Sequence, residues 1–115
     1  MFLLNDPPKV VHCSTEKLVN YALDPLKEPN KAMAFKKALG YTQDNYQSLK
    51  DQIMELADES KFVEKGDSGY GMKYEYIFEA TGANGEKANV LTAWIHEGED
   101  KRLTSVYVTK RGVTE

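Results

Sequence analysis

Residues 70–97, YGMKYEYIFEATGANGEKANVLTAWIHE, carry the clearest structural signal in the chain. Met72, Tyr74, Tyr76 and Phe78 would share one face of an extended strand, and Lys73, Glu75 and Glu79 would share the other, so one face would be buried and the other exposed to solvent. The Asn84–Gly85 pair interrupts this pattern, and such a pair favours a tight turn between antiparallel strands. The stretch therefore predicts a β-hairpin whose strands are residues 70–80 and 87–97.

Two more strand-like runs flank this hairpin, KFVEK at 61–65 and RLTSVYVTK at 102–110. Turn sequences separate the runs, GDSG at 66–69 and EGEDK at 97–101. Because turns this short join antiparallel neighbours, the four runs predict an antiparallel meander. The segment Lys9–Cys13 is a candidate for one further strand.

The first half of the chain follows a helical period, with apolar residues three and four positions apart. Its segments are bounded by residues that cap or stop helices: Ser14, Pro25, Asn30, Gly40 and Thr42. The third and longest helix is expected at residues 43–59. Because the apolar stripes of these helices need a partner surface, we expect an α+β fold. Its single domain, residues 1–115, would pack N-terminal helices on a four- to five-stranded antiparallel meander sheet.

Length and composition are those of one ordinary globular domain. The 115 residues are 41% hydrophobic and 29% charged, with a net charge of −3, which argues against disorder and against a coiled coil. No apolar run is long enough to span a bilayer. Residues 1–13 lack a basic start and contain Pro7 and Pro8, so we expect no signal peptide.

The single cysteine, Cys13, has no partner for an internal disulfide, and no cysteine–histidine cluster suggests zinc. The reducing cytoplasm is therefore the expected place of action. Cys13 next to His12 could form a nucleophile–base pair. The favoured interpretation is instead a small residue at the edge of a strand.

Charge is distributed unevenly along the chain. Residues 1–50 carry a net charge of +2 and residues 51–85 carry −5, while residues 86–115 are neutral. The helical half offers a small basic face: Lys27, Lys31, Lys36 and Lys37. A face of this size is more typical of ordinary solvation than of nucleic-acid binding.

No P-loop, GxGxxG, HExxH or GxSxG motif is present, which removes the usual support for nucleotide binding, zinc proteolysis and α/β-hydrolase chemistry. Individual polar residues remain candidates for phosphate chemistry. Lys31 and Lys73 could stabilise a pentacovalent phosphorane by their charge. Thr92, Ser105 and Tyr107 could add hydroxyl donors.

Proton transfer has few candidates. His96 lies near the end of a predicted strand, on the same face as Trp94, and could act as a general acid or base. A histidine at such a place is more often simply exposed. Glu75 and Glu79 share one face of a strand and could act as paired carboxylates, but two solvated surface acids are the favoured interpretation.

Four strings resemble a bacterial domain family of officially unknown function: KLVNYALDP at 17–25, KAMAFKKALGYTQDN at 31–45, YGMKYEYIFEATGANGEKANVLTAWI at 70–95 and RLTSVYV at 102–108. The resemblance covers residues 14–108. Members of this family occur as small stand-alone proteins and as C-terminal domains of polymorphic, contact-dependent toxins. They usually carry a His-Pro pair and a basic loop before the second string, whereas this chain has Asp24–Pro25 and a shorter loop. If that histidine is catalytic in relatives, this chain uses another base or lacks the activity.

The expected order of helices and meander is also similar to the barnase, EndoU, colicin and RelE group of ribonuclease folds. Together the resemblances imply a toxin-like domain that cleaves tRNA or rRNA in the target cytoplasm without a metal or cofactor. In such a reaction the RNA 2′-OH attacks the adjacent phosphate and leaves a 2′,3′-cyclic product. The implied protein partner is a cognate immunity protein. Delivery as the C-terminal part of a larger secreted protein is a further expectation.

The alternative function is a non-catalytic interaction module whose acidic residues 51–85 dock a basic patch on a partner protein. Such a module would bind its partner in a salt-sensitive way and would not cleave RNA. A third possibility, an enzyme acting on a small molecule, has no motif support.

Overall fold

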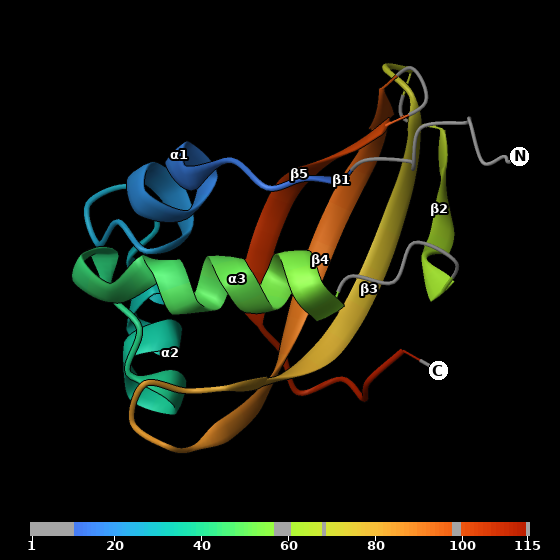
Figure 1. The fold of residues 1–115 in the computed structure, drawn as a ribbon. Coiled ribbons are helices and arrows are strands. Elements are labelled where there is room, and N and C mark those ends of the chain that lie inside the picture. Colours follow the sequence, from blue (N-terminus) through green and yellow to red (C-terminus); the bar gives the residue numbers. More distant parts are fainter. Residues whose placement is uncertain (1–10, 57–60, 68, 98–99, 115) are drawn as a thin grey trace, which may run out of the picture.

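The computed structural model describes residues 11–56, 61–67, 69–97 and 100–114. The fold has two layers: helices from the N-terminal half lie against one face of a twisted β-sheet formed mainly by the C-terminal half (Figure 1). This arrangement confirms the α+β prediction of N-terminal helices packed on an antiparallel meander. Among the described residues, no helix combines the length and the apolar character needed to cross a membrane.

Four strands form the meander: β2 (Val63–Asp67), β3 (Met72–Thr81), β4 (Lys87–Glu97) and β5 (Asp100–Val108). Each strand pairs antiparallel with the next, and all four lie within two residues of the predicted runs. The register between β4 and β5 shifts at a β-bulge, so that Ala93 pairs with Ser105 whereas Trp94 pairs with Leu103. The side-chain alternation of β5 is therefore offset by one residue at this point.

A fifth strand, β1 (Val11–His12), lies next to β5 and completes the strand order β1-β5-β4-β3-β2. The expectation of a further strand within Lys9–Cys13 is confirmed for these two residues, while Lys9 and Val10 lie outside the described part. β1 runs parallel to β5, unlike the other pairs. The parallel direction is possible because the helical half of the chain connects β1 to the rest of the sheet.

The helical layer contains α1 (Thr15–Lys17), a π-helical turn η1 (Leu18–Ala22), α2 (Pro29–Leu39), a 3-10 turn η2 (Gln43–Asn45) and α3 (Tyr46–Leu56). Ser14 and Thr42 cap as predicted, since their hydroxyls accept backbone N–H groups two residues later. Gly40 ends α2 in the left-handed conformation, with a φ of 73°. The prediction of Asn30 as a cap is wrong, because α2 begins at Pro29, whose fixed φ suits the first helical position.

The third helix differs from its prediction at both ends. Residues 43–45 form the 3-10 turn instead of α-helix, and the α-helix itself begins at Tyr46. It is described as far as Leu56, so the rest of the predicted range lies outside the described residues.

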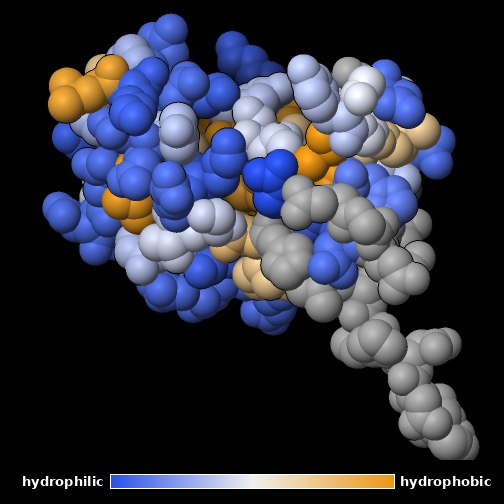
Figure 2. Space-filling model, turned by 90° about the horizontal axis from the view of Figure 1, so that it is seen from above, coloured by the Kyte–Doolittle hydropathy of each residue, from blue (hydrophilic) through white to orange (hydrophobic). Residues whose placement is uncertain are grey.

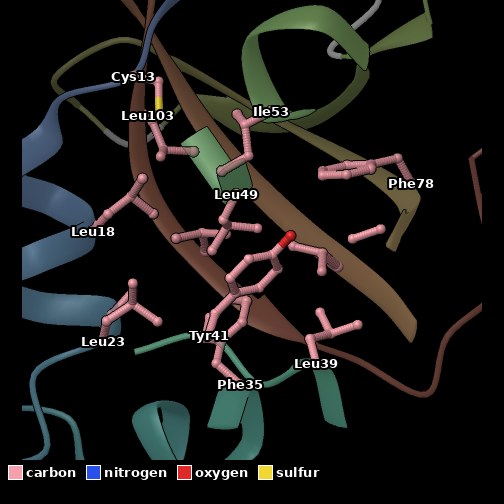
Figure 3. Close-up of a cluster of buried hydrophobic side chains, with 14 of the residues drawn as sticks. Cys13, Leu18, Leu23, Phe35, Leu39, Tyr41, Leu49, Ile53, Phe78 and Leu103 are labelled. Carbon is pink, nitrogen blue, oxygen red and sulfur yellow. The ribbon is translucent and has the colours of Figure 1, made fainter. Parts of the chain in front are cut away.

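The hydrophobic core lies between the helices and the sheet (Figure 3). The helical layer and its loops contribute Leu18, Leu23, Phe35, Leu39, Tyr41, Leu49 and Ile53, and the sheet contributes Tyr76, Phe78, Val90, Trp94, Leu103 and Val106. Burial of each large side chain contributes about 1.5–3 kcal/mol, so this cluster holds the layers together. On the surface seen from above, hydrophobic residues form only small separate groups among hydrophilic ones (Figure 2).

The opposite face of the sheet, here named the back face, is crossed by the C-terminal segment (residues 109–114). The Asn89 side chain of β4 donates to the Arg111 carbonyl oxygen at 3.0 Å. Thr114 then exchanges two hydrogen bonds of 2.9 Å with the backbone of Ile77, on the outer edge of β3. The segment therefore occupies a part of the β3 edge that β2 does not reach.

Candidate functional site

The back face contains an open hollow of about 360 Å³. Three residues in register cross it from strand to strand: Glu75 in β3, Ala93 in β4 and Ser105 in β5. Ala93 and Ser105 have short side chains, whereas Lys65 and Lys73, which also line the hollow, have long ones. The hollow therefore combines a small-residue floor with a carboxylate, a hydroxyl and two ammonium groups.

Lys31 of α2 reaches the back face at the edge of β5. Its Nζ lies 3.4 Å from Ser105 Oγ, 3.9 Å from a carboxylate oxygen of Glu28 and 5.4 Å from the centroid of the Tyr107 ring. Ser105 and Tyr107 are two residues apart in β5, so both belong to the back face. The structure thus brings together three of the six predicted site residues, Lys31, Ser105 and Tyr107.

Lys73 belongs to the same group through the hollow that it shares with Ser105. It is exposed on β3 and pairs in register with Ile95. Glu75 and Ser105 stand two strands apart, a separation of roughly 10 Å between their backbones. This spacing leaves room for a phosphodiester group between cations that approach from β3 and from α2.

Glu75 is held by two cations. Arg111 Nη2 lies 3.1 Å and Lys65 Nζ lies 3.9 Å from Glu75 Oε1, and the Glu75 side chain is only 20% exposed. This buried oxygen accepts no hydrogen bond from the described residues, because closeness alone does not orient N–H groups. The interpretation as a solvated acid is therefore wrong for Glu75. It holds for Glu79, which is 57% exposed and pairs with Lys87 at 3.9 Å.

Sequence reasoning weighed Glu75 but favoured a solvated acid, and it missed Lys65 and Arg111 as members of this site. Lys65 had a signal in the sequence, because the predicted meander places the run 61–65 beside the strand that contains Glu75. The structure pairs Val63 of this run with Glu75. No short sequence pattern predicts that Arg111 lies beside Glu75, because its position depends on how the C-terminal segment crosses the sheet.

Thr92, a predicted hydroxyl donor, lies in the core instead of the hollow. Its side chain is completely buried on the helix side of β4. Its Oγ1 donates to the Tyr76 carbonyl oxygen at 2.6 Å and accepts from Trp94 Nε1 at 2.8 Å. The hydroxyl therefore satisfies two buried polar groups of the sheet.

His96, the predicted acid or base, is separated from the hollow by the sheet. It follows Trp94 by two residues on β4 and so belongs to the helix side, whereas Ala93 belongs to the back face. The exposed imidazole ring lies edge-on to Tyr74, with 6.4 Å between the ring centroids. His96 and Ser105 do not share a surface on which they could act together.

Cys13 is buried next to the core, and burial raises the pKa of its thiol from 9.0 to about 11, with Lys50 acting in the opposite direction. The thiol is therefore neutral near pH 7 and unsuited to nucleophilic attack. The described ranges contain no group of three His, Cys, Asp or Glu side chains placed to hold a metal ion.

Comparison with known proteins gives one assignment. No curated protein and no solved structure matches the chain significantly. A protein-family model matches residues 3–110, which agrees with the expectation of an uncharacterised family over most of the chain. The chain therefore belongs to the family described as Domain of unknown function (DUF6883).

Proposed function

We propose that this domain is a metal-independent ribonuclease and that the back-face hollow is its active site. The observation that supports this proposal is the gathering of Lys31, Ser105 and Tyr107 beside a hollow that also contains Glu75 and Lys73. A phosphodiester bound there would have a carboxylate on one side and ammonium groups within reach. These are the groups that transesterification of RNA requires.

In the proposed reaction, the Glu75 carboxylate accepts the proton of the RNA 2′-OH. The 2′-oxygen then forms a bond to phosphorus while the bond from phosphorus to the 5′-oxygen breaks, and water protonates the departing oxygen. Lys31 and Lys73 stabilise the additional negative charge of the phosphorane, while Ser105 and Tyr107 position its oxygens. The product ends are a 2′,3′-cyclic phosphate and a free 5′-hydroxyl.

The biological setting is part of the same proposal. The resemblance to C-terminal domains of contact-dependent toxins supports a toxin that acts on tRNA or rRNA in the cytoplasm of a target cell. A cell that makes such a toxin needs a cognate immunity protein. The back face is the surface that this partner would cover, since covering the hollow would block access of RNA.

Cleavage of total bacterial RNA by the purified protein in the presence of EDTA tests the proposal. We expect 2′,3′-cyclic ends and a rate that falls about 10²- to 10⁴-fold in Glu75→Gln. Glu79→Gln is the matched control, because Glu79 lies on the same strand outside the hollow, and it should cleave like the unmodified protein. Intact RNA after incubation with the unmodified protein would overturn the proposal.

Lys31 offers a second test of the charge-stabilising role. Lys31→Ala should slow cleavage by about 10- to 10³-fold, whereas Lys31→Arg keeps the positive charge and should retain most of the rate. Equal losses in both variants would contradict stabilisation by charge.

The alternative is a non-catalytic module that docks through acidic residues 51–85, but the described part of this segment does not gather its acids on a single surface. Among the described residues, the acids of this segment are spread over α3, β2 and β3. Glu75 and Glu79 are paired with cations of the same chain. Salt-sensitive binding of a basic protein together with intact RNA would favour this alternative.

A further inference from the structure

Tyr21 of η1 lies on the surface beside the hollow, and two lysine ammonium groups approach its ring. The Nζ atoms of Lys17 and Lys27 each lie 5.0 Å from the centroid of the Tyr21 ring. The Tyr21 residue is 40% exposed. Solvent therefore reaches an aromatic ring that has two ammonium groups close to it.

The π-helical turn explains this exposure. In η1, Leu18 and Ala22 point into the core, and Tyr21 is left outside. Lys17 comes from the preceding turn, and Lys27 comes from the loop before α2. Single π turns are often found at functional sites, because they shift side chains away from the regular helical pattern.

A small cavity joins Tyr21 to the proposed active site. It has a volume of about 70 Å³, and its lining includes Lys17, Tyr21, Lys31 and Ser105. Lys31 is the residue whose Nζ lies 3.4 Å from Ser105 Oγ. A chain of nucleotides that leaves the hollow past Lys31 would meet Tyr21 next.

A second, larger hollow of about 310 Å³ adjoins Tyr21 between η1 and β5. Lys17, Tyr21 and Arg102 line it, together with Ser14, Glu16 and Leu103. Across the two cavities, the acids are Glu16 and Glu28, and Glu28 is paired with Lys31. The cations around Tyr21 outnumber these acids, so the surface favours an anionic ligand.

We infer that Tyr21, Lys17 and Lys27 form a nucleotide subsite for single-stranded RNA. When RNA binds, the flexible side chains of Lys17 and Lys27 turn from the Tyr21 ring to the phosphates on either side of a nucleotide that flanks the cleaved bond. The base of this nucleotide then stacks on the ring. Stacking on an aromatic ring is independent of base identity, so the subsite adds affinity without strong sequence preference. This inference rests on the proposed function, because the hollow fixes where the RNA strand begins.

Binding of an uncleavable RNA separates the subsite from catalysis. The probe is a short fluorescent single-stranded RNA with a 2′-O-methyl group on every nucleotide, which removes the attacking hydroxyl. We expect Tyr21→Ala to weaken binding about 5- to 100-fold, whereas Tyr21→Phe, which keeps the ring, should bind like the unmodified protein. Similar thermal unfolding of the two variants would show that the loss does not come from unfolding.

The two lysines have a matched control. The double variant Lys17→Ala/Lys27→Ala should lower the slope of log affinity against log salt by about 1.4, since each phosphate contact on a single strand contributes about 0.7. Lys36→Ala/Lys37→Ala removes the same charge from exposed positions of α2 and should leave the slope unchanged. An equal change in both double variants would mean that only net charge matters and would overturn the subsite.

The remaining outcomes are distinct. If the unmodified protein does not bind the probe, or if Tyr21→Ala binds it as tightly as the unmodified protein, the subsite is wrong even where RNA is cleaved. If binding depends on the Tyr21 ring but natural RNA stays intact, the subsite stands and the ribonuclease proposal fails.

Discussion

Glu75 and Arg111 form an ion pair on the back face, with 3.1 Å between Arg111 Nη2 and Glu75 Oε1. The pair fixes the C-terminal segment to the middle of β3. It also leaves the Glu75 carboxylate between two cations, Arg111 and Lys65. The same ion pair therefore holds the C-terminal segment on the sheet and places a positive charge beside the carboxylate of the hollow.

Arg111→Ala should lower the free energy of unfolding by less than about 1 kcal/mol, because the guanidinium is more than half exposed and water screens the pair. The difference from the unmodified protein should shrink between about 0.05 M and about 1 M salt. Urea unfolding at both salt concentrations measures this difference in the free energy of unfolding, and Lys110→Ala is the control for loss of a neighbouring charge. A difference that salt does not change would mean that Arg111 acts by packing and not by charge.

Thr92→Val should lower the free energy of unfolding by about 1–3 kcal/mol, because the variant keeps the shape of the side chain but leaves the Trp94 indole N–H without its acceptor. Thr92→Ser keeps the hydroxyl and loses one methyl group, so a cost of about 1 kcal/mol is expected. Urea unfolding followed by tryptophan fluorescence compares the two. A larger loss in Thr92→Ser than in Thr92→Val would contradict a role for this hydrogen bond.

The strands could be predicted from the sequence because their alternation is a local property. Residues 72–76 alternate between apolar and charged side chains, the Asn84–Gly85 pair indicates the turn, and β3 and β4 follow within two residues of the predicted runs. The parallel direction of β1 and the π turn at Leu18–Ala22 could not be predicted. Both depend on how the helices pack on the sheet, and no short sequence window contains that information.

The site was only partly predictable for a related reason. On β4, Leu91 and Trp94 lie on opposite faces and are both buried, so hydrophobicity alone does not tell which face is open. Residue type alone predicts Thr92, His96 and Ser105 as site residues, whereas the period of β4 places Thr92 and His96 on the face opposite to Ala93, the register partner of Ser105. The contact of Lys31 with Ser105 depends on packing between α2 and the edge of β5.

His96→Gln should leave the rate of RNA cleavage and its pH dependence unchanged between about pH 5 and pH 8, because the imidazole lies on the helix side of β4 next to Tyr74. Single-turnover cleavage rates across this range test the prediction. Glu75→Gln serves as the positive control for loss of the base. A folded His96→Gln protein that does not cleave RNA at any pH would assign the proton transfer to His96 and contradict the placement of the site.

The buried thiol of Cys13 should make stability fall at alkaline pH. Below pH 9 the thiol is protonated in both the folded and the unfolded chain, so it adds no pH dependence. Burial raises the pKa of the folded thiol to about 11 from 9.0, so between these values the unfolded chain loses a proton that the folded chain keeps. The free energy of unfolding therefore decreases as pH rises through this window, by on the order of 2–3 kcal/mol in total.

Cys13→Ala isolates this effect, because every other titratable group is shared by both proteins. The substitution removes some packing at every pH, which shifts the whole curve of stability against pH. In addition, the free energy of unfolding of the variant should fall less steeply between pH 9 and about pH 11 than that of the unmodified protein. Urea unfolding at a series of pH values compares the two slopes. Parallel curves would show that the folded thiol ionises as readily as the unfolded one, and so that water reaches Cys13 despite its place next to the core.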